Sequence, residues 1–116
     1  MVAGKLLFFL ISLEVGGVSL AIAAEKTASL FAEICSICHG AGGKGDGPSA
    51  AGLYPKPADF TDCKLMAGER DTTLFTIIKR GGAGVGRSTV MPSWGEALSD
   101  EQIRELVAFI RSLCKK

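Results

Sequence analysis

The chain has 116 residues, which fits one small domain, and its 13 basic and 12 acidic residues give a formal net charge of +1 at pH 7. A chain so close to neutral has no electrostatic reason to bind nucleic acid or an anionic membrane surface, and we expect neither as a partner. Hydrophobic residues make up 47% of the chain, and the N-terminal segment raises that figure.

Residues 1–23 have the features of a secretory signal peptide. Lys5 gives a short positive region, an apolar run follows it, and small residues lead up to Ala23. Glu14 interrupts the apolar run, whereas a membrane-spanning helix needs about 20 apolar residues without a charge. An uncleaved membrane anchor is therefore the weaker alternative. We expect cleavage after Ala23 and a single domain at residues 24–116 in the periplasm.

The first part of this domain predicts a helix followed by a long loop. The helix is expected to start with Thr27 as its N-cap, to show helical apolar spacing, and to end at Gly40. Residues 40–57 are rich in glycine and proline and predict a loop.

Two further helices complete an all-α domain, since no strand pattern competes with them. Asp71 is expected to cap a second helix that ends at Gly81. Ser99 and Gln102 form a capping box at the start of the last helix. That helix has one apolar stripe, made of Ile103, Leu106, Val107, Ile110 and Leu113.

Cys35, Cys38 and His39 form a Cys-x-x-Cys-His motif, which is the strongest chemical signal in the chain. On a helix the three side chains fall at i, i+3 and i+4 and share one face. Two thiols on one face can add to the two vinyl groups along one edge of a haem, and the adjacent imidazole can ligate the iron. The motif is therefore typical of covalent attachment of one haem c.

Two other kinds of site use a Cys-x-x-Cys pair. A thioredoxin-like redox pair belongs to a βαβ pattern, which the sequence lacks. A structural zinc site needs four ligands, usually with a second closely spaced pair, but Cys63 and Cys114 are far apart. His39 is the only histidine in the chain and occupies the one position that haem attachment requires.

A second axial ligand has to come from elsewhere in the chain, and a methionine thioether suits electron transfer. Met91 lies in a loop just before Pro92, and the glycine-rich stretch ahead of it would let the backbone pass close to a flat cofactor. Met66 is expected to fill the core, as methionine usually does. We therefore expect His39 and Met91 to ligate the iron.

Three segments, residues 35–40, 91–95 and 98–111, together resemble the class I c-type cytochromes of the short bacterial monohaem type. The resemblance implies the class I cytochrome c fold, with small helices wrapped around one haem, and a one-electron carrier rather than an enzyme. With His39 and Met91 filling both axial positions, no small-molecule substrate is expected. Membrane or periplasmic oxidoreductases would serve as electron donor and acceptor.

The resemblance also implies roles for single residues around the haem. Phe31 matches the aromatic residue that packs the first helix against the last, where Phe109 is one of its partners. Pro48 matches a proline whose carbonyl accepts a hydrogen bond from the Nδ1–H of His39, which would orient the imidazole. Trp94 stands where relatives often place an aromatic side chain near a haem propionate.

Cys63 and Cys114 depart from the minimal pattern and leave alternatives open. They could form a disulfide, remain quiet thiols, or Cys63 could ligate the iron in place of Met91 and lower its potential. A labile Cys63 or a weak Met91 would favour a haem-based sensor of small gases. A third alternative is a haem subunit of a larger oxidoreductase complex, with the same chemistry and a permanent interface.

Overall fold

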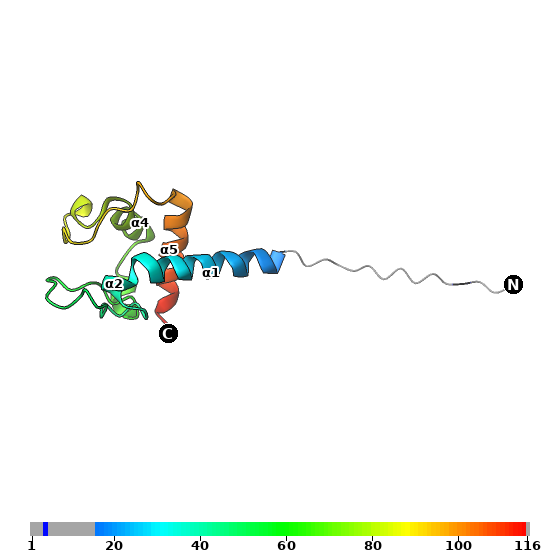
Figure 1. Ribbon diagram of the computed structural model, residues 1–116, viewed down its shortest axis with the longest axis horizontal. Helices are drawn as coiled ribbons and strands as arrows, with labels where there is room; N and C mark the ends of the chain where they lie inside the picture. The colour runs from blue at the N-terminus through cyan, green and yellow to red at the C-terminus, as the bar shows by residue number, and fades with distance from the viewer. Residues whose placement is uncertain (1–3, 5–15, 116) are drawn as a thin grey trace.

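The computed structural model describes Gly4 and residues 16–115, so most of the predicted signal peptide at 1–23 lies outside the described residues. The described part contains helices and no strand, which confirms the all-α prediction. The elements in chain order are α1 (Gly16–Ile34), α2 (Ser36–His39), α3 (Cys63–Ala67), α4 (Asp71–Arg80), the 3₁₀ turn η1 (Ala83–Val85) and α5 (Asp100–Leu113) (Figure 1).

The core forms where α5 packs against both α1 and α4. Phe31 on α1 is 2% exposed and its ring lies 5.0 Å from that of Phe109 on α5, as the sequence predicted for this pair of helices. Met66 is also buried in this core, which confirms its predicted role as core filling. The buried cluster consists of Phe31, Phe60, Met66, Leu74, Leu106, Val107 and Ile110.

Helix α1 begins earlier than predicted. It starts at Gly16, so the prediction of Thr27 as N-cap was wrong. Nothing between these two residues breaks a helix, because the stretch has no proline and is rich in alanine and other helix formers. The hydroxyl of Thr27 instead lies within hydrogen-bond distance of the Ala23 carbonyl and the Glu105 carboxylate on α5.

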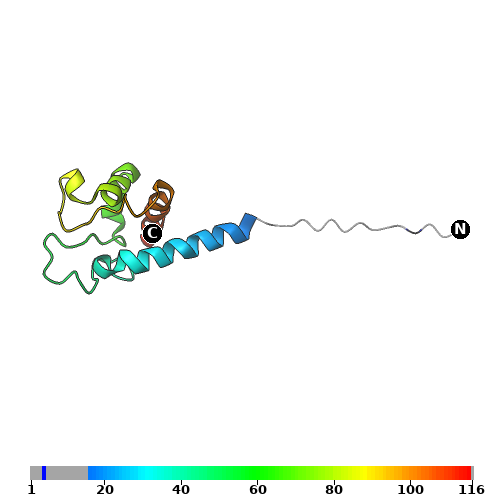
Figure 2. The same ribbon diagram turned by 45° about the horizontal axis from the view of Figure 1, so that its top comes forward.

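The N-terminal half of α1 extends away from the rest of the domain (Figure 2). Its side chains Val18, Leu20 and Ile22 are largely exposed. Among the residues that the structure describes, no helix is both long and apolar enough to cross a membrane.

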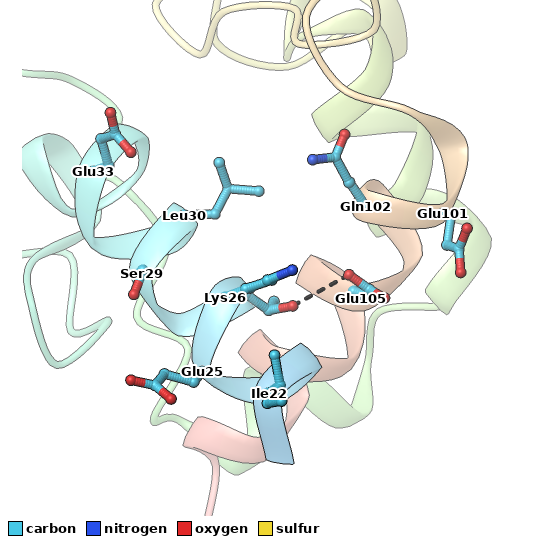
Figure 3. A pocket seen from close by; sticks show the side chains of 10 residues that line it. Ile22, Glu25, Lys26, Ser29, Leu30, Glu33, Glu101, Gln102 and Glu105 are labelled. Atoms are coloured by element: carbon cyan, nitrogen blue, oxygen red, sulfur yellow. Dashed lines mark hydrogen bonds between the residues drawn. The ribbon is translucent and has the colours of Figure 1, made fainter. Parts of the chain in front are cut away.

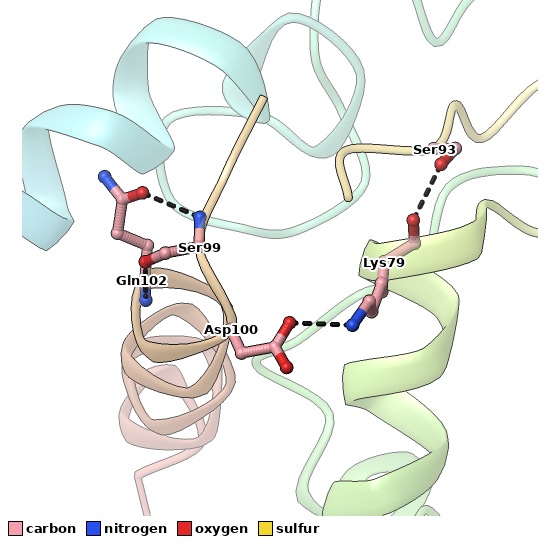
Figure 4. Close-up of polar contacts among 5 residues, drawn as sticks. All are labelled: Lys79, Ser93, Ser99, Asp100 and Gln102. Carbon is pink, nitrogen blue, oxygen red and sulfur yellow. Dashed lines mark hydrogen bonds and ion pairs between the residues drawn. The ribbon is translucent and has the colours of Figure 1, made fainter. Parts of the chain in front are cut away.

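The start of α5 has the capping box that the sequence predicted (Figure 4). The Ser99 hydroxyl accepts a hydrogen bond from the backbone N–H of Gln102 at 3.1 Å, and the Gln102 side chain accepts one from the Ser99 N–H at 2.9 Å. Two N–H groups that the helix itself cannot satisfy are thereby bonded.

The other helix boundaries show where local signals were incomplete. Asp71 is the first residue of α4 rather than its N-cap, which is Arg70, while Gly81 ends the helix as predicted with φ 77°. Helix α3 was not predicted. The residue that marks its start is the N-cap Asp62, whose carboxylate accepts hydrogen bonds from the N–H groups of Lys64 and Leu65.

Cys63 and Cys114 form a disulfide that joins the start of α3 to the C-terminal end of α5, with their Cα atoms 5.1 Å apart. Of the three alternatives that the sequence left open, the structure therefore selects the disulfide. The idea that Cys63 ligates the iron was wrong, because its sulfur is already bonded.

Replacing both cysteines, as Cys63→Ser with Cys114→Ser, should lower the free energy of unfolding by about 2–4 kcal/mol. The disulfide closes a long stretch of chain into a loop. Without it the unfolded chain has more conformational entropy, which favours unfolding. The measurement is urea unfolding of the protein with its haem attached. Wild-type protein unfolded in the presence of a thiol reductant should match the double variant, and equal stability of all three samples would contradict the prediction.

Candidate haem site

The Cys-x-x-Cys-His motif forms a helical turn directly after α1. Although α1 ends at Ile34, the helical hydrogen bonds continue, from the Cys35 N–H to the Phe31 carbonyl and from the His39 N–H to the Cys35 carbonyl, each at 2.9 Å. The two thiols and the imidazole thus lie within one turn. Because Phe31 is part of the core, the turn is fixed to the rest of the domain.

Both thiols of the motif are free, whereas the other two cysteines of the chain are bonded to each other. Cys35 and Cys38 are partly exposed. Burial raises the pKa of the Cys35 thiol to about 11, so this thiol is protonated at neutral pH. Two unused thiols on one turn are what covalent attachment to a cofactor requires.

The imidazole of His39 is oriented by a backbone carbonyl. Its Nδ1 lies 3.2 Å from the carbonyl oxygen of Ala58, and since a carbonyl can only accept, Nδ1 carries the proton. Nε2 then has the lone pair that a metal needs. Burial lowers the pKa of His39, and the bond to Ala58 opposes that shift in part, so the ring is neutral at neutral pH.

The prediction that Pro48 supplies this carbonyl was wrong. The loop after α2 first runs along the end of that helix, where the N–H groups of Gly47 and Ser49 bond to the carbonyls of Cys38 and Ile37. Pro48 lies exposed between them. The carbonyl that bonds to the His39 ring is that of Ala58, nineteen residues further along the sequence.

Phe60 is a site residue that the sequence analysis missed. Its ring stacks on the imidazole of His39, with the ring centres 4.5 Å apart and the planes at 21°. The same ring makes an edge contact with Phe31 at 6.4 Å, so it connects the imidazole to the core. An aromatic residue following a glycine- and proline-rich loop was the signal that could have identified it.

Met91 lies at the end of a second loop, residues 82–91, which closes on Gly82. The N–H of Gly82 donates to the Met91 carbonyl at 3.1 Å, and the Gly82 carbonyl accepts from the N–H of Arg87 at 2.8 Å. A Cβ on Gly82 would lie 2.1 Å from the carbonyl oxygen of Ser88, so only glycine allows this approach. Met91 is partly buried, while Met66 is occupied in the core.

The residues after Met91 are bonded to the end of α4. The hydroxyl of Ser93 donates to the Lys79 carbonyl at 2.6 Å (Figure 4). The N–H groups of Trp94 and Gly95 donate to the carbonyls of Ile78 and Lys79 at 2.9 and 3.0 Å. These bonds satisfy carbonyls that the helix end leaves free and fix the segment in place. The role of Trp94 beside a haem propionate stays a prediction.

An open groove of about 680 Å³ lies between α1 and α5 (Figure 3). Its charged lining is mainly acidic, formed by Glu25, Glu33, Glu101 and Glu105 together with Lys26. None of the predicted haem-site residues lines this groove, so it is separate from the haem site.

The donor set fits a haem c. Cys35 and Cys38 would form the covalent links, the free Nε2 of His39 would bind the iron, and Met91 is the methionine that packing leaves available among the described residues.

Comparison with known proteins agrees with this chemistry. The family model described as cytochrome c oxidase, cbb3-type, subunit III matches residues 23–110. The chain belongs to this family. It is a class I c-type cytochrome, whose cofactor is covalently attached haem c.

Relatives with curated descriptions include subunits of two kinds of oxidoreductase. The cbb3-type cytochrome c oxidase subunit FixP of Azorhizobium caulinodans is 35% identical over 92 residues, which are 78% of this chain and 27% of that protein. The gluconate 2-dehydrogenase cytochrome c subunit of Pantoea cypripedii is 34% identical over 93 residues, which are 75% of this chain and 20% of that protein. The chain thus spans about a quarter of the length of the first relative and a fifth of that of the second.

A solved structure, the KustC0563 c-type cytochrome, superimposes with a TM-score of 0.61 at 24% identity. The match covers 77% of this chain and 98% of that chain. At this identity the likeness supports the fold, which is the all-α cytochrome c fold that the sequence predicted.

Replacing Gly82 by alanine should displace the loop that ends at Met91, because the new Cβ would collide with the Ser88 carbonyl. With haem attached, the ferric protein should lose most of the weak near-infrared absorption band that marks a thioether–iron bond.

Gly42→Ala is the matched control for that variant. It lies in the other glycine-rich loop, and its Cβ would meet nothing closer than 4.0 Å. This variant should keep the band. A Gly82→Ala protein with an undiminished band would contradict the assignment of Met91 as a ligand held by this loop.

Proposed function

We propose that this protein carries single electrons on one haem c, attached through Cys35 and Cys38 and ligated by His39 and Met91. The observation that carries the proposal is the one-turn arrangement of two free thiols and an imidazole whose Nδ1 is already bonded. When bound, haem supplies an iron that alternates between the ferric and ferrous states.

The work of the protein's own residues is to hold the two axial ligands still. Ala58 fixes the proton of His39 on Nδ1, and Phe60 stacks against the ring, so the imidazole is held by contacts on two sides. The closed 82–91 loop holds the Met91 backbone through the hydrogen bond that the Gly82 N–H donates to the Met91 carbonyl. Ligands that stay in place in both oxidation states keep the rearrangement on electron transfer small. With both His39 and Met91 bound to the haem iron, no coordination position would remain for a substrate, as expected for a carrier rather than an enzyme.

The partners we propose are membrane or periplasmic oxidoreductases. The names of the relatives support this, because they describe cytochrome subunits of an oxidase and of a dehydrogenase. The same names favour a haem subunit of such a complex as the second form of this function. Size-exclusion chromatography of the native extract would separate the two, since a free carrier elutes alone and a subunit elutes with its complex.

The ligand assignment is tested by absorption spectra of the protein in both oxidation states, produced in a host that attaches haem in the periplasm. Wild type should show a low-spin c-type spectrum with the near-infrared thioether band. Met91→Ala should lose that band, and its reduced form should bind carbon monoxide, because one axial position is open.

Met66→Leu is the control for Met91→Ala, since it changes the buried methionine and keeps an apolar side chain of similar size. It should retain the band and resist carbon monoxide. A wild-type protein without the band that binds carbon monoxide rapidly would overturn the carrier proposal and favour the gas sensor.

We propose that residues 1–23 direct export and are removed, which places residues 24–116 in the periplasm. The small residues before Ala23 support cleavage there. The intact mass of the holoprotein purified from the periplasm should correspond to a chain that begins at Ala24. A mass that includes residues 1–23, found in the membrane fraction, would support the anchored form instead.

A further inference from the structure

The 82–91 loop is tied to the rest of the domain by a charged contact near its tip. Arg87 Nη1 lies 2.7 Å from Glu69 Oε1, with 49% of the arginine side chain and 20% of the glutamate side chain exposed. Glu69 follows α3 and is distant from the loop in sequence. The ion pair thus connects two segments that the backbone does not hold together.

Glu69 is itself anchored by Arg111 on α5. The guanidinium of Arg111 donates from Nη2 to the Glu69 carbonyl, from Nη1 to the Met66 carbonyl, and from Nε to the Asp71 carboxylate at 2.8 Å. Arg111 thus holds the main chain at Glu69 in place. The Glu69 side chain, which starts from this fixed backbone, can in turn hold Arg87 through the ion pair.

The backbone hydrogen bonds of the loop do not provide such a connection. Within the described structure, the N–H groups of Gly84, Val85, Gly86 and Arg87 donate to carbonyls of residues 81–83, so they close the loop on itself. Val90, next to Met91, is 52% exposed and its N–H bonds to the Ser88 hydroxyl. Apart from Gly84, which lies against the Arg80 side chain at the end of α4, the loop therefore depends on its side chains for contact with the body of the domain.

We propose that the Arg87–Glu69 ion pair is a positioning contact that keeps the 82–91 loop closed, so that Met91 remains on the iron and outside ligands are kept off. This inference rests on the proposed ligation by Met91. When the loop opens, Met91 leaves the iron and an outside ligand can bind. The apparent affinity of that ligand is its intrinsic affinity multiplied by the open fraction. Breaking the ion pair raises the open fraction and hence the apparent affinity.

The test is a titration of the ferric holoprotein with imidazole at low ionic strength, followed by loss of the near-infrared thioether band. Arg87→Gln and Glu69→Gln should each bind imidazole roughly threefold to tenfold more tightly than wild type, as expected for a partly exposed charged hydrogen bond. The double variant should resemble either single variant, because each change removes the same contact. Arg87→Lys should keep most of the wild-type resistance.

Ionic strength gives a second readout. Salt screens a partly exposed ion pair, so the imidazole affinity of wild type should rise toward that of Arg87→Gln as salt is added. The Arg87→Gln protein, which lacks the pair, should respond much less.

Asp100→Asn is the matched control. It breaks the ion pair between Asp100 and Lys79, of comparable length at 2.8 Å and also partly exposed, and neither residue belongs to the 82–91 loop or to the contacts of Glu69 with Arg111. It should leave imidazole affinity at the wild-type value even where urea unfolding shows lower stability.

Two results would overturn the inference while leaving the carrier function intact. One is an Arg87→Gln protein with wild-type imidazole affinity. The other is an Asp100→Asn protein whose affinity rises as much as that of Arg87→Gln, which would mean that general destabilisation opens the loop. If wild type itself lacks the thioether band, the proposed ligation fails first, and the inference fails with it.

Discussion

The contact between α1 and α5 is the interaction on which the rest of the structure depends. Phe31 is buried against Phe109, and burial of an aromatic side chain contributes about 1.5–3 kcal/mol to stability. Phe31 also accepts the backbone hydrogen bond of Cys35, so the packing that forms the core fixes the orientation of the Cys-x-x-Cys-His turn. Phe60 extends the same core to the His39 ring. The Cys-x-x-Cys-His turn and the His39 ring are therefore both in direct contact with core residues.

The loop after α2 and the segment after Met91 are ordered by the same physical requirement, which is that carbonyls at a helix end need donors. The first loop gives the N–H groups of Gly45, Gly47 and Ser49 to the end of α2. The segment after Met91 gives those of Trp94 and Gly95 to the end of α4. Glycine is needed where these backbones meet, since a Cβ on Gly47 would lie 2.4 Å from the Ile37 carbonyl. Satisfying helix ends therefore also places the residues that we assign to the iron.

Local signals predicted some helix boundaries and not others. Ser99 and Gln102 gave the start of α5 correctly, because a capping box involves neighbouring residues alone. Thr27 was wrong as an N-cap, since a cap residue matters only where the preceding chain stops being helical, and α1 continues back to Gly16. Helix α3 was overlooked because it has five residues, too few to show a helical period.

By itself, the sequence determined the all-α class and the haem c cofactor. It also predicted that Cys35, Cys38 and His39 hold the haem and that Met91, rather than Met66, is the second iron ligand. These follow from residue types at short spacing, which one helical turn or one loop brings together. Tertiary structure decided the Cys63–Cys114 disulfide, the Ala58 carbonyl at His39, the stacking of Phe60 and the Arg87–Glu69 ion pair. Each of these joins segments that are distant along the chain or that loops of irregular shape bring together. Their contact depends on how the helices pack, and a pattern of neighbouring residues in the sequence does not predict that packing.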